Sequence, residues 1–387
     1  MSFELKALKD ICTIQIGKTP SRHENDFWRD GTHAWLSIAD MNQGRYLTTT
    51  KECITDLGVR ASNIKLIPKN TLVLSYKLSI GKVGITQKPM YTNEAIASLT
   101  ELDPQIDINY LYWALQHIDL LENADRAAMG KTLNKAKLSE VKIPLPPLPE
   151  QRRIASILDQ ADELRQKRQQ AIEKLDQLLQ ATFIDMFGDP VSNPKGWDLY
   201  KLSDLGSIST GNTPSRDDAD NFGNYLEWIK SDNLNNDEDY ATTATEYLSE
   251  KGAKKGRVVP EGSILVTCIA GSFDCIGNLA MVDRKVSFNQ QINSITPNDT
   301  VVLEFLYYLM KISKPIIQNA STNSMKGMIS KSKFSEILLP IPSKEKQIQF
   351  VELFKKLYGL KVSHKLYSNN ADSLFKSLQI QAFNGTL

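Results

Sequence analysis

Apolar and polar positions follow the same order twice along the chain. Short strand-like runs bounded by Gly, Pro, Asn and Asp come first, and a helix-like apolar segment follows, at 109–116 in the first part and at 304–311 in the second. This order predicts two α+β units of about 150 residues each. The strand-like runs cover residues 11–16, 71–75, 83–86, 208–210, 263–269 and 278–282.

The two parts also match in their motifs. Residues 1–154 and 197–348 can be aligned at an offset of 192 to 196 residues. Both copies contain Ile-x-x-Gly-x-Thr-Pro-Ser-Arg, which ends at Arg22 in the first and at Arg216 in the second. A duplicated chain carries two similar working surfaces, so we expect a target with two recognition sites.

A long helix is predicted after each unit. Residues 150–187 contain no Pro or Gly and are rich in good helix formers, and Gly188 and Pro190 end the segment. Residues at spacings of three and four form a mainly apolar heptad stripe in this segment and in 343–387, which a single helix cannot bury alone. The stripes consist of Ile154, Ile157, Ala161, Leu164, Ala171, Leu175, Leu178 and Thr182, and of Phe350, Leu353, Leu357, Leu360, Tyr367, Ala371, Leu374 and Leu378.

These stripes predict that the two helices pair with each other. Because each helix follows its own unit, we expect an antiparallel coiled coil about 55 Å long. Arg168 and His364 are the central members of the stripes and are expected near the middle. They either point their polar ends to water or act as buried polar residues that set the register, and the sequence leaves both open.

Composition is that of a globular protein. The chain has 387 residues, of which 41% are hydrophobic and 24% charged, enough for two or three domains. It contains no apolar run of membrane-spanning length and no apolar core of a secretion signal, so we expect a cytoplasmic protein. Its cysteines form no CxxC pair, and we expect reduced thiols and no metal site at Cys12, Cys53, Cys268 and Cys275.

Positive charge is concentrated in two segments although the chain as a whole is nearly neutral. The net charge is only +1, yet residues 311–335 contain lysines and no acid, and the matching stretch 125–142 is also mainly basic. Each stretch alone is explained by a solvated loop, but its recurrence at matching positions favours contact with phosphates. The basic residues are Lys311, Lys314, Lys326, Lys331 and Lys333, and Arg126, Lys131, Lys135, Lys137 and Lys142.

No catalytic motif is found in the sequence. The Gly17-Lys18-Thr19 tripeptide lacks the preceding glycine of a phosphate-binding loop, because Cys12 stands there. The tetrapeptide of amino-methyltransferases and the common dinucleotide, hydrolase and metalloprotease motifs are also missing. We therefore expect a protein without an activity or cofactor of its own.

Two further groups have competing interpretations. Asn93 and Asn289 either read adenine edges or bond their own backbone in a turn. A set of aromatic residues offers base-stacking surfaces or belongs to the cores, and the recurrence of these residues beside apolar neighbours favours the cores. The set comprises Trp35, Tyr76, Tyr91, Tyr110, Tyr112, Trp113, Trp228, Tyr307 and Tyr308.

Several motifs together resemble the specificity subunit of type I restriction-modification systems. They are the Gly-x-Thr-Pro-Ser loop of each copy, the Pro-Leu-Pro-Pro-Leu-Pro-Glu-Gln-Arg-Arg-Ile-Ala-Ser-Ile-Leu run at 144–158, Phe-Gly-Asp-Pro at 187–190, and the C-terminal Gln-Ala-Phe-Asn-Gly-Thr-Leu. The resemblance covers nearly the whole chain. One departure is the weakened form of the proline-rich run before the second helix, at 342–348, which puts in question whether both helices hold a partner equally.

The resemblance implies an α+β fold with two tandem target-recognition domains, separated by two long helices. The domains would be residues 1–149 and 190–342, and the helices 150–187 and 343–387. Each domain would read one half of a split DNA site, and the helices would bind two modification subunits that carry S-adenosylmethionine and methylate adenine. Restriction subunits with translocase and nuclease activity would join this complex.

For DNA contact we select three loops in each domain. Lysine and arginine on loops can hold phosphates, while neighbouring polar groups read base edges. Because the two domains differ in sequence, we expect an asymmetric bipartite target. The selected residues are Lys18, Thr19, Ser21, Arg22, Lys77, Lys82, Arg126, Lys131 and Lys135, and Asn212, Thr213, Ser215, Arg216, Lys230, Lys326 and Lys331.

Three alternatives stay open at this point. The first is a fused methyltransferase or nuclease with degenerate motifs, which S-adenosylmethionine binding by the isolated chain would reveal. The second is a scaffold that joins two proteins and binds no DNA, which the near-neutral net charge favours. The third is a DNA-recognition or scaffold subunit of a related phage-defence complex.

Overall fold

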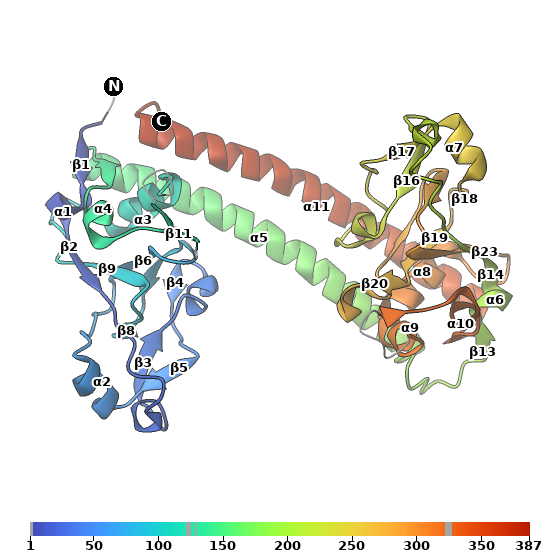
Figure 1. Cartoon of the computed structure of the whole chain (residues 1–387), viewed down its shortest axis with the longest axis horizontal. Helices are drawn as coiled ribbons and strands as arrows, with labels where there is room; N and C mark the ends of the chain where they lie inside the picture. Colours follow the sequence, from blue (N-terminus) through green and yellow to red (C-terminus); the bar gives the residue numbers. More distant parts are fainter. Residues whose placement is uncertain (1–2, 121–124, 128–129, 322–326) are drawn as a thin grey trace. The chain divides into compact units, whose positions relative to one another are not determined.

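The computed structural model describes residues 3–120, 125–127, 130–321 and 327–387, and the chain divides into two compact units (Figure 1). Unit 1 comprises Met1–Gln169 with Leu366–Leu387, and unit 2 comprises Gln170–Lys365. Each unit therefore contains one of the duplicated parts together with one half of each long helix.

Both units are α+β, and their elements follow the same order. Those that begin in unit 1 are β1 (Leu5–Ala7), α1 (Leu8–Ile11), β2 (Thr13–Ile16), η1 (Asn25–Phe27), β3 (His33–Leu36), η2 (Asp40–Gln43), β4 (Tyr46–Leu47), β5 (Glu52–Ile54), α2 (Asp56–Ser62), β6 (Leu72–Ser75), β7 (Val83–Thr86), β8 (Tyr91–Thr92), β9 (Ile96–Thr100), α3 (Ile108–His117), β10 (Asp125–Ala127), β11 (Gly130–Thr132), α4 (Lys135–Ser139), β12 (Lys142–Pro144) and α5 (Leu148–Phe187).

Those that begin in unit 2 are β13 (Leu199–Lys201), α6 (Leu202–Leu205), β14 (Gly206–Thr210), η3 (Ala219–Asn221), β15 (Phe222–Gly223), β16 (Leu226–Ile229), η4 (Ser231–Leu234), β17 (Tyr247–Leu248), α7 (Glu250–Lys255), β18 (Val258–Val259), β19 (Ile264–Thr267), β20 (Ile269–Ala270), η5 (Phe273–Cys275), β21 (Leu279–Met281), β22 (Val286–Phe288), β23 (Ile292–Pro297), α8 (Leu303–Ile312), α9 (Lys314–Asn319), β24 (Gly327–Met328), α10 (Lys331–Ser335), β25 (Leu338–Pro340) and α11 (Lys344–Asn384).

The sheets repeat the same pairing in both units. A main sheet has the order β2-β9-β6-β7-β4 in unit 1 and β14-β23-β19-β21 in unit 2. The strands of a second sheet, β5-β3-β8 in unit 1 and β15-β17-β16-β22-β18 in unit 2, lie between those of the main sheet along the chain. Every residue of β6 and of β19 is buried, as expected for central strands with continuous apolar runs. Each predicted strand run contains a strand, but several of the runs are too long. Ile11 ends the short helix α1, and Cys12, Thr71, Ser263, Cys268, Asn278 and Val282 also lie outside the strands.

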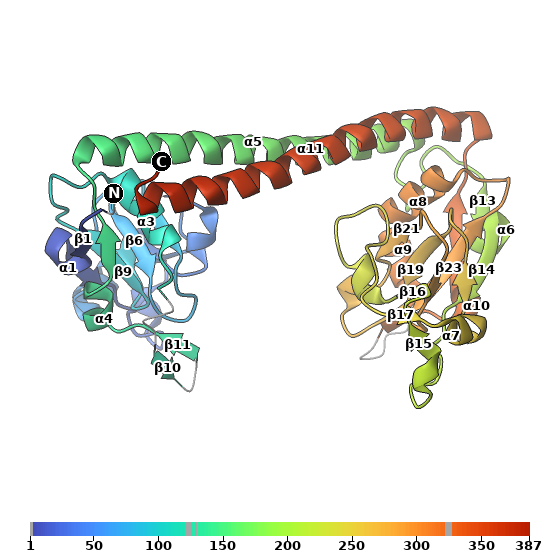
Figure 2. The ribbon, with the colours of Figure 1, turned by 90° about the horizontal axis from the view of Figure 1, so that it is seen from above.

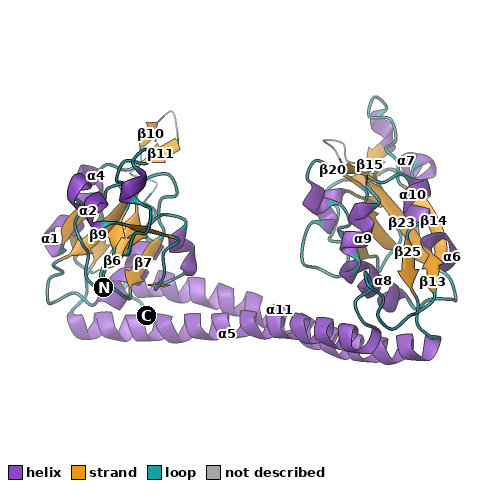
Figure 3. Cartoon of the chain, turned by 90° about the horizontal axis from the view of Figure 1, so that it is seen from below, coloured by secondary structure: helices purple, strands orange, loops and turns teal. Residues whose placement is uncertain are grey.

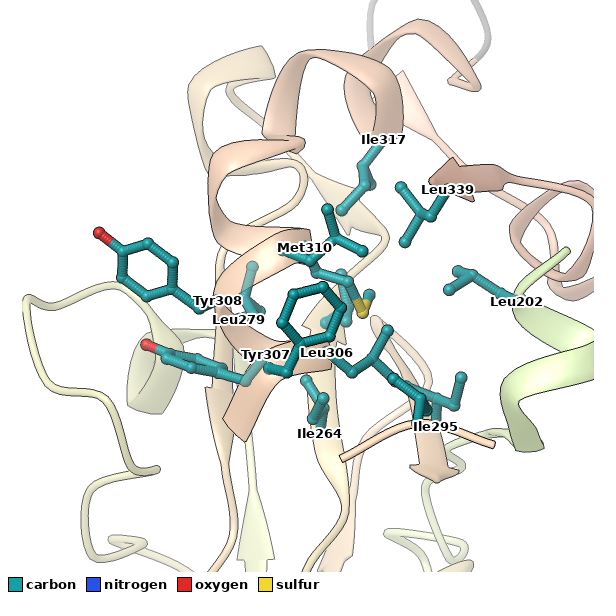
Figure 4. Packing of buried hydrophobic residues seen from close by; sticks show 14 of the residues in the cluster. Leu202, Ile264, Leu279, Ile295, Leu306, Tyr307, Tyr308, Met310, Ile317 and Leu339 are labelled. Atoms are coloured by element: carbon teal, nitrogen blue, oxygen red, sulfur yellow. The ribbon is translucent and has the colours of Figure 1, made fainter. Parts of the chain in front are cut away.

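A late helix covers each main sheet and forms the core with it. Figure 4 shows Leu306 and Met310 of α8 among side chains from β19, β21, β23, α6, α9 and β25. The core interpretation of the aromatic set is confirmed, because all of these side chains are buried, and base stacking by them is excluded. They are Trp35, Tyr76, Tyr91, Tyr110, Tyr112, Trp113, Trp228, Tyr307 and Tyr308.

The two long helices run antiparallel within each unit (Figures 1 and 2). In unit 1, Phe383 near the end of α11 packs on Tyr110 with ring centroids 5.7 Å apart, and it shares a core cluster with Ile154 of the first turns of α5. In unit 2, Phe187 at the end of α5 packs on Phe350 near the start of α11, at 5.7 Å. The antiparallel coiled coil is therefore present, and it completes the core of both units.

The seam between the helices differs from the prediction at some of its positions. Tyr367 and the leucines Leu164, Leu178, Leu360 and Leu374 are exposed, so their assignment to the stripe is wrong. The residue that follows each of the four leucines lies in the seam instead. These residues are Arg165, Leu179, Lys361 and Phe375. Two of these residues, Arg165 and Lys361, are charged, and a pattern of apolar residues does not predict charged residues in a seam. Each of the two charges is matched by an ion pair with the other helix.

Arg168 and His364 lie at the middle of α5 and α11, as predicted. Both are partly buried, and the Arg168 guanidinium lies 5.4 Å from the ring centroid of Tyr367. Among the described residues, Arg168 Nε and His364 Nδ1 have no hydrogen-bond partner. The simple water-facing interpretation is therefore wrong for these two atoms.

A buried glutamine anchors the start of each long helix. Gln151 accepts a hydrogen bond from the Asp107 amide (2.9 Å) and donates to the carbonyls of Gln105 and Pro146 (both 2.9 Å). Its counterpart Gln347 accepts from the Val302 amide (2.9 Å) and donates to Pro342 O (3.0 Å). The weakened second motif thus keeps the residue that ties the helix to its unit.

Candidate nucleic-acid interface

The shared motif forms a tight loop against the end of a neighbouring strand. The Lys18 amide donates to Thr92 O at 2.8 Å, and the Asn212 amide donates to Phe288 O at 3.1 Å. A side chain at Gly17 would overlap the carbonyls of Thr92 and Asn93, and one at Gly211 would overlap Asn289 O. Only glycine permits this approach, which explains why the motif needs it in both copies.

The threonine and the tryptophan of each copy hold this loop in place. Thr19 donates to Glu94, and Thr213 donates to Gln290. The buried Trp35 donates its Nε1 hydrogen to Lys18 O at 3.0 Å. Trp228 does the same to Asn212 O at 3.2 Å. The loop conformation is therefore set by contacts that the duplication has kept.

The arginine at the end of each motif is paired with an acid and stacked on aromatic rings. Arg22 makes two hydrogen bonds to Glu52, at 2.5 and 2.9 Å, and lies 3.7 Å from the ring centroid of Trp28. The hydrogen bond from Arg22 lowers the pKa of Glu52. These predicted DNA-contacting groups are held by the protein itself, so contact with a phosphate would require exchange of partner.

In unit 2 the same acid serves two cations. Arg216 donates to Glu246 at 2.8 Å, and Lys230 donates to the other oxygen of this carboxylate. The hydrogen bond from Lys230, followed by that from Arg216, lowers the pKa of Glu246. Lys230 therefore lies beside the motif loop, as its selection requires, although its charge is already matched.

A hairpin loop lies beside the motif loop in each unit. It joins β6 to β7 in unit 1 and β19 to β21 in unit 2. The Tyr76 amide donates to Ala95 O at 3.0 Å, and the Cys268 amide donates to Gln291 O at 2.8 Å. These bonds join the hairpin to the turn on which the motif loop rests.

The late basic segment meets the hairpin at one matching point. Leu133 donates its amide to Tyr76 O at 3.1 Å, and Ile329 donates to Cys268 O at 2.8 Å. In unit 1 the strands β10 and β11 of this segment stand at the end of the unit remote from α5 (Figures 2 and 3). Three loops thus come together in each unit, and we call each set the loop cluster.

The remaining selected residues fall into three groups. Lys18, Ser21, Lys135, Ser215 and Lys331 are exposed, and Lys135 and Lys331 both begin a short helix after an Asn or Ser cap. Lys82 donates to Asn42 at 2.6 Å, and the Lys77 ammonium lies 5.3 Å from the Tyr76 ring centroid. The side chains of Arg126 and Lys131, and Lys326 as a whole, lie outside the described residues.

The structure decides two sequence-based expectations and adds one loop that the sequence did not predict. Lys311 is not a free basic residue, because it pairs with the buried Asp239 at 2.7 Å. Asn93 and Asn289 each accept a hydrogen bond at Oδ1 from the backbone two residues on, at 3.1 Å, which confirms the turn interpretation. The hairpin loop of unit 2, residues 268–278, was missed because it contains no lysine or arginine to mark it.

The described residues indicate no metal centre, and two of their cysteines are deeply buried. No cluster of metal-ligating side chains occurs among the described residues, and all four cysteines there are free. Burial raises the pKa of Cys12 and of Cys268 to about 12, so both are inert thiols at neutral pH. No helix in the described part of the chain is long and apolar enough to cross a membrane.

The duplicated fold and the paired loop clusters define a protein built from two similar α+β units. A family profile described as type I restriction modification DNA specificity domain matches the chain twice, over residues 2–174 and 194–367. The chain belongs to this family.

Individual relatives agree with this assignment. The type I restriction enzyme MjaIX specificity subunit of Methanocaldococcus jannaschii is 28% identical over 236 residues, which are 56% of this chain and 54% of that protein. The HindI specificity subunit of Haemophilus influenzae is 34% identical over 194 residues, 48% of this chain and 41% of that protein. The chain thus spans about half the length of the curated relatives it matches.

The fold is also that of a solved specificity subunit. The crystal structure of the type I restriction-modification system S subunit from M. genitalium aligns with a TM-score of 0.60 and 16% identity. The alignment covers 99% of this chain and 96% of that one. At this level of identity the likeness concerns the fold.

Proposed function

We propose that this protein is the non-catalytic DNA-specificity subunit of a type I restriction-modification complex. Its recognition domains would be residues 1–149 and 190–342, each reading one half of a bipartite DNA site. The helices at 150–187 and 343–387 would dock two modification subunits, and restriction subunits would join through the complex. The partners would supply adenine methylation, translocation and cleavage.

The observation that carries this proposal is the loop cluster present in both units. In each cluster, motif loop, hairpin and basic segment are joined by backbone hydrogen bonds at matching positions. Loops held by a rigid sheet suit base readout, while lysines such as Lys135 and Lys331 suit phosphate contacts. A protein that only joined two partners through its helices would have no need of such repeated clusters.

Differences between the clusters support an asymmetric target. The hairpin from Thr267 to Asn278 is longer than the one from Ser75 to Lys82 and contains the additional helical turn η5. In unit 1 Arg22 donates to Glu52, whereas in unit 2 both Arg216 and Lys230 donate to Glu246. Two surfaces that differ in length and charge are expected to recognise different half-sites.

Methylation sequencing tests the proposal directly. DNA from cells with and without this gene, in the presence of the modification subunits, should differ at one bipartite motif with two different halves. A palindromic motif, or the same methylation pattern in both strains, would contradict the proposal. Binding of S-adenosylmethionine by the isolated chain would contradict the absence of an activity of its own.

A further inference from the structure

Each hairpin loop exposes one large apolar side chain. Leu78 in unit 1 is 71% exposed, and Phe273 in unit 2 is 54% exposed. Both lie in the loop that joins the equivalent strands of the main sheet, and the basic segment attaches near the start of that loop, at Tyr76 and at Cys268. Isolated apolar side chains are common on protein surfaces, so the recurrence at matching places needs support from the loops themselves.

The conformation of Leu78 supplies the first support. Its φ angle is +62°, in the left-handed region, which costs an L-residue with a bulky side chain about 1–2 kcal/mol. The loop keeps this conformation, because Ser75 Oγ donates to Ser79 O at 2.5 Å and accepts from the Lys82 amide at 2.9 Å. Gly or Asn would adopt this positive φ with less strain, and the leucine side chain is too exposed to gain much stability from burial.

The hairpin of unit 2 holds Phe273 in a comparable way. Its carbonyl accepts hydrogen bonds from the Ile276 amide at 3.0 Å and from Gln318 Nε2 at 3.2 Å. The next carbonyl, of Asp274, accepts from Lys314 Nζ at 2.7 Å. The backbone is therefore fixed while the ring remains largely in water.

We propose that Leu78 and Phe273 are specificity-determining residues, each of which contacts the 5-methyl group of a thymine in the half-site read by its own unit. This inference rests on the proposed function. An apolar side chain cannot distinguish hydrogen-bond donors from acceptors, and the thymine methyl is the apolar group that base pairs present in the major groove. The flanking Lys77 and Lys82 would hold the backbone beside it.

Insertion between base pairs is the competing use of an apolar tip. It requires unstacking of a base step, at a cost of a few kcal/mol, and is mostly found in proteins that bend DNA from the minor groove. A methyl contact needs no such distortion. We therefore assign the exposed side chains to a methyl contact, because this contact does not require the DNA to be unstacked or bent.

The first test separates recognition from stability. Leu78→Asn and Leu78→Gly both suit a positive φ, so each full-length variant should melt at the same temperature as the parent protein or higher. Each should nevertheless bind DNA about fourfold more weakly in the assembled complex, the value of one buried methyl group. A loss of melting temperature without a loss of DNA affinity would show that Leu78 is structural and would overturn the proposal.

Matched controls come from the other side of each unit. Leu5 on β1 and Leu199 on β13 are equivalent, similarly exposed, and lie on the strands that pair with β12 and β25, just before the long helices. Leu5→Thr and Leu199→Thr should leave DNA affinity unchanged. Phe273→Ala should weaken binding as Leu78→Asn does, but through the second half-site.

The second test addresses the methyl group itself. The probe is a duplex carrying the site found by methylation sequencing, with thymines replaced one at a time by uracil. One replacement in each half-site should weaken binding of the parent complex about fourfold, and Leu78→Asn should abolish the effect in one half-site only. Equal effects of the uracil replacements in parent and variant would overturn the proposal.

The two proposals fail in different ways. If the parent complex does not bind the duplex, the proposed function is wrong and this inference falls with it. If the parent complex binds and the variants at Leu78 and Phe273 bind equally well, the specificity-subunit function stands and only the methyl contact is refuted.

Discussion

Arg165 of α5 and Asp372 of α11 form an ion pair, with Nε and Oδ1 2.6 Å apart, and the pair recurs in the other unit with the helices exchanged. There Lys361 of α11 binds Asp176 of α5 at 2.7 Å. Each residue lies 196 positions from its equivalent in the first pair. Each helix thus supplies the cation in one unit and the anion in the other, which favours a single antiparallel register.

Reversing one charge of this pair should destabilise unit 1. Arg165→Glu or Asp372→Arg places like charges together, and because both side chains are partly exposed we expect a loss of about 1 kcal/mol in the free energy of unfolding. The double variant should recover most of this loss, as a double-mutant cycle by urea unfolding can measure. Lys167→Glu, which disrupts an exposed pair within α5, serves as the control and should cost less than about 0.5 kcal/mol.

The equivalent cation in unit 2 should matter more, because it is buried. Lys361 lies 2.7 Å from Asp176 and 3.6 Å from the buried Asp239, which also receives Lys311 and the Tyr307 hydroxyl. Lys361→Met removes one of the two cations facing Asp239 and should cost about 3 kcal/mol. An unchanged urea midpoint for Lys361→Met would show that Lys311 alone neutralises Asp239.

Asp239 should also make the stability of unit 2 depend on acid pH. Burial alone would raise its pKa, but the charges of Lys311 and Lys361 and its hydrogen bonds outweigh burial and lower it. A lowered pKa gives stability that is present above pH about 4, the unfolded value, and is lost as the pH falls through the folded pKa. The stability difference between the parent and Asp239→Asn should therefore shrink below pH 4, and a constant difference from pH 3 to 7 would contradict this role.

The buried glutamines should be equivalent in both units. Gln151→Ala and Gln347→Ala each leave a buried amide and a buried carbonyl without a partner, so each should cost about 2 kcal/mol. Gln170→Ala, at an exposed position of α5, is the control. Urea unfolding of the three variants compares them, and a much smaller cost at Gln347 would mean that the weaker second motif also anchors its helix less well.

The exposed lysines of the basic segments should contribute through phosphate contacts. Lys135→Glu and Lys331→Glu should each weaken DNA binding by the assembled complex for all sequences alike, and lower the salt dependence by about one counterion. Lys142→Glu, on the strand β12 that leads toward α5, should leave both unchanged. Fluorescence anisotropy at several salt concentrations measures both the affinity and its salt dependence. If neither changes in Lys135→Glu and Lys331→Glu, these lysines do not contact DNA.

Sequence periodicity located the long helices and their direction but only part of their seam. Ile154 and Phe350 occupy buried positions as predicted, whereas Leu164 and Leu360 were chosen over the charged residues that follow them. A heptad pattern assumes apolar seams, and it cannot recognise a lysine or arginine whose partner lies on a helix about 200 residues away.

The loop clusters show the same limit. The motif loops at Lys18 and Asn212 were found because the duplication repeats their letters. The hairpin of unit 2 was missed because it differs in length from the Lys77 loop and contains no basic residue. The two loops are equivalent only because they join equivalent strands, which the sequence does not show. The sequence also does not show that Arg22 is paired, because its partner Glu52 lies 30 residues further along the chain.

The packing of Phe375 and Phe383 against α3 has a consequence for synthesis of the chain. At about 5–20 residues per second, on the order of ten seconds pass between emergence of the first unit from the ribosome and arrival of the segment that closes it. During this interval Tyr110 and Trp113 lack their aromatic cover, so the earliest part of the polypeptide to be made is the last to be completed. Ribosomes stalled shortly before Leu366 should therefore carry a nascent chain that chaperones still recognise.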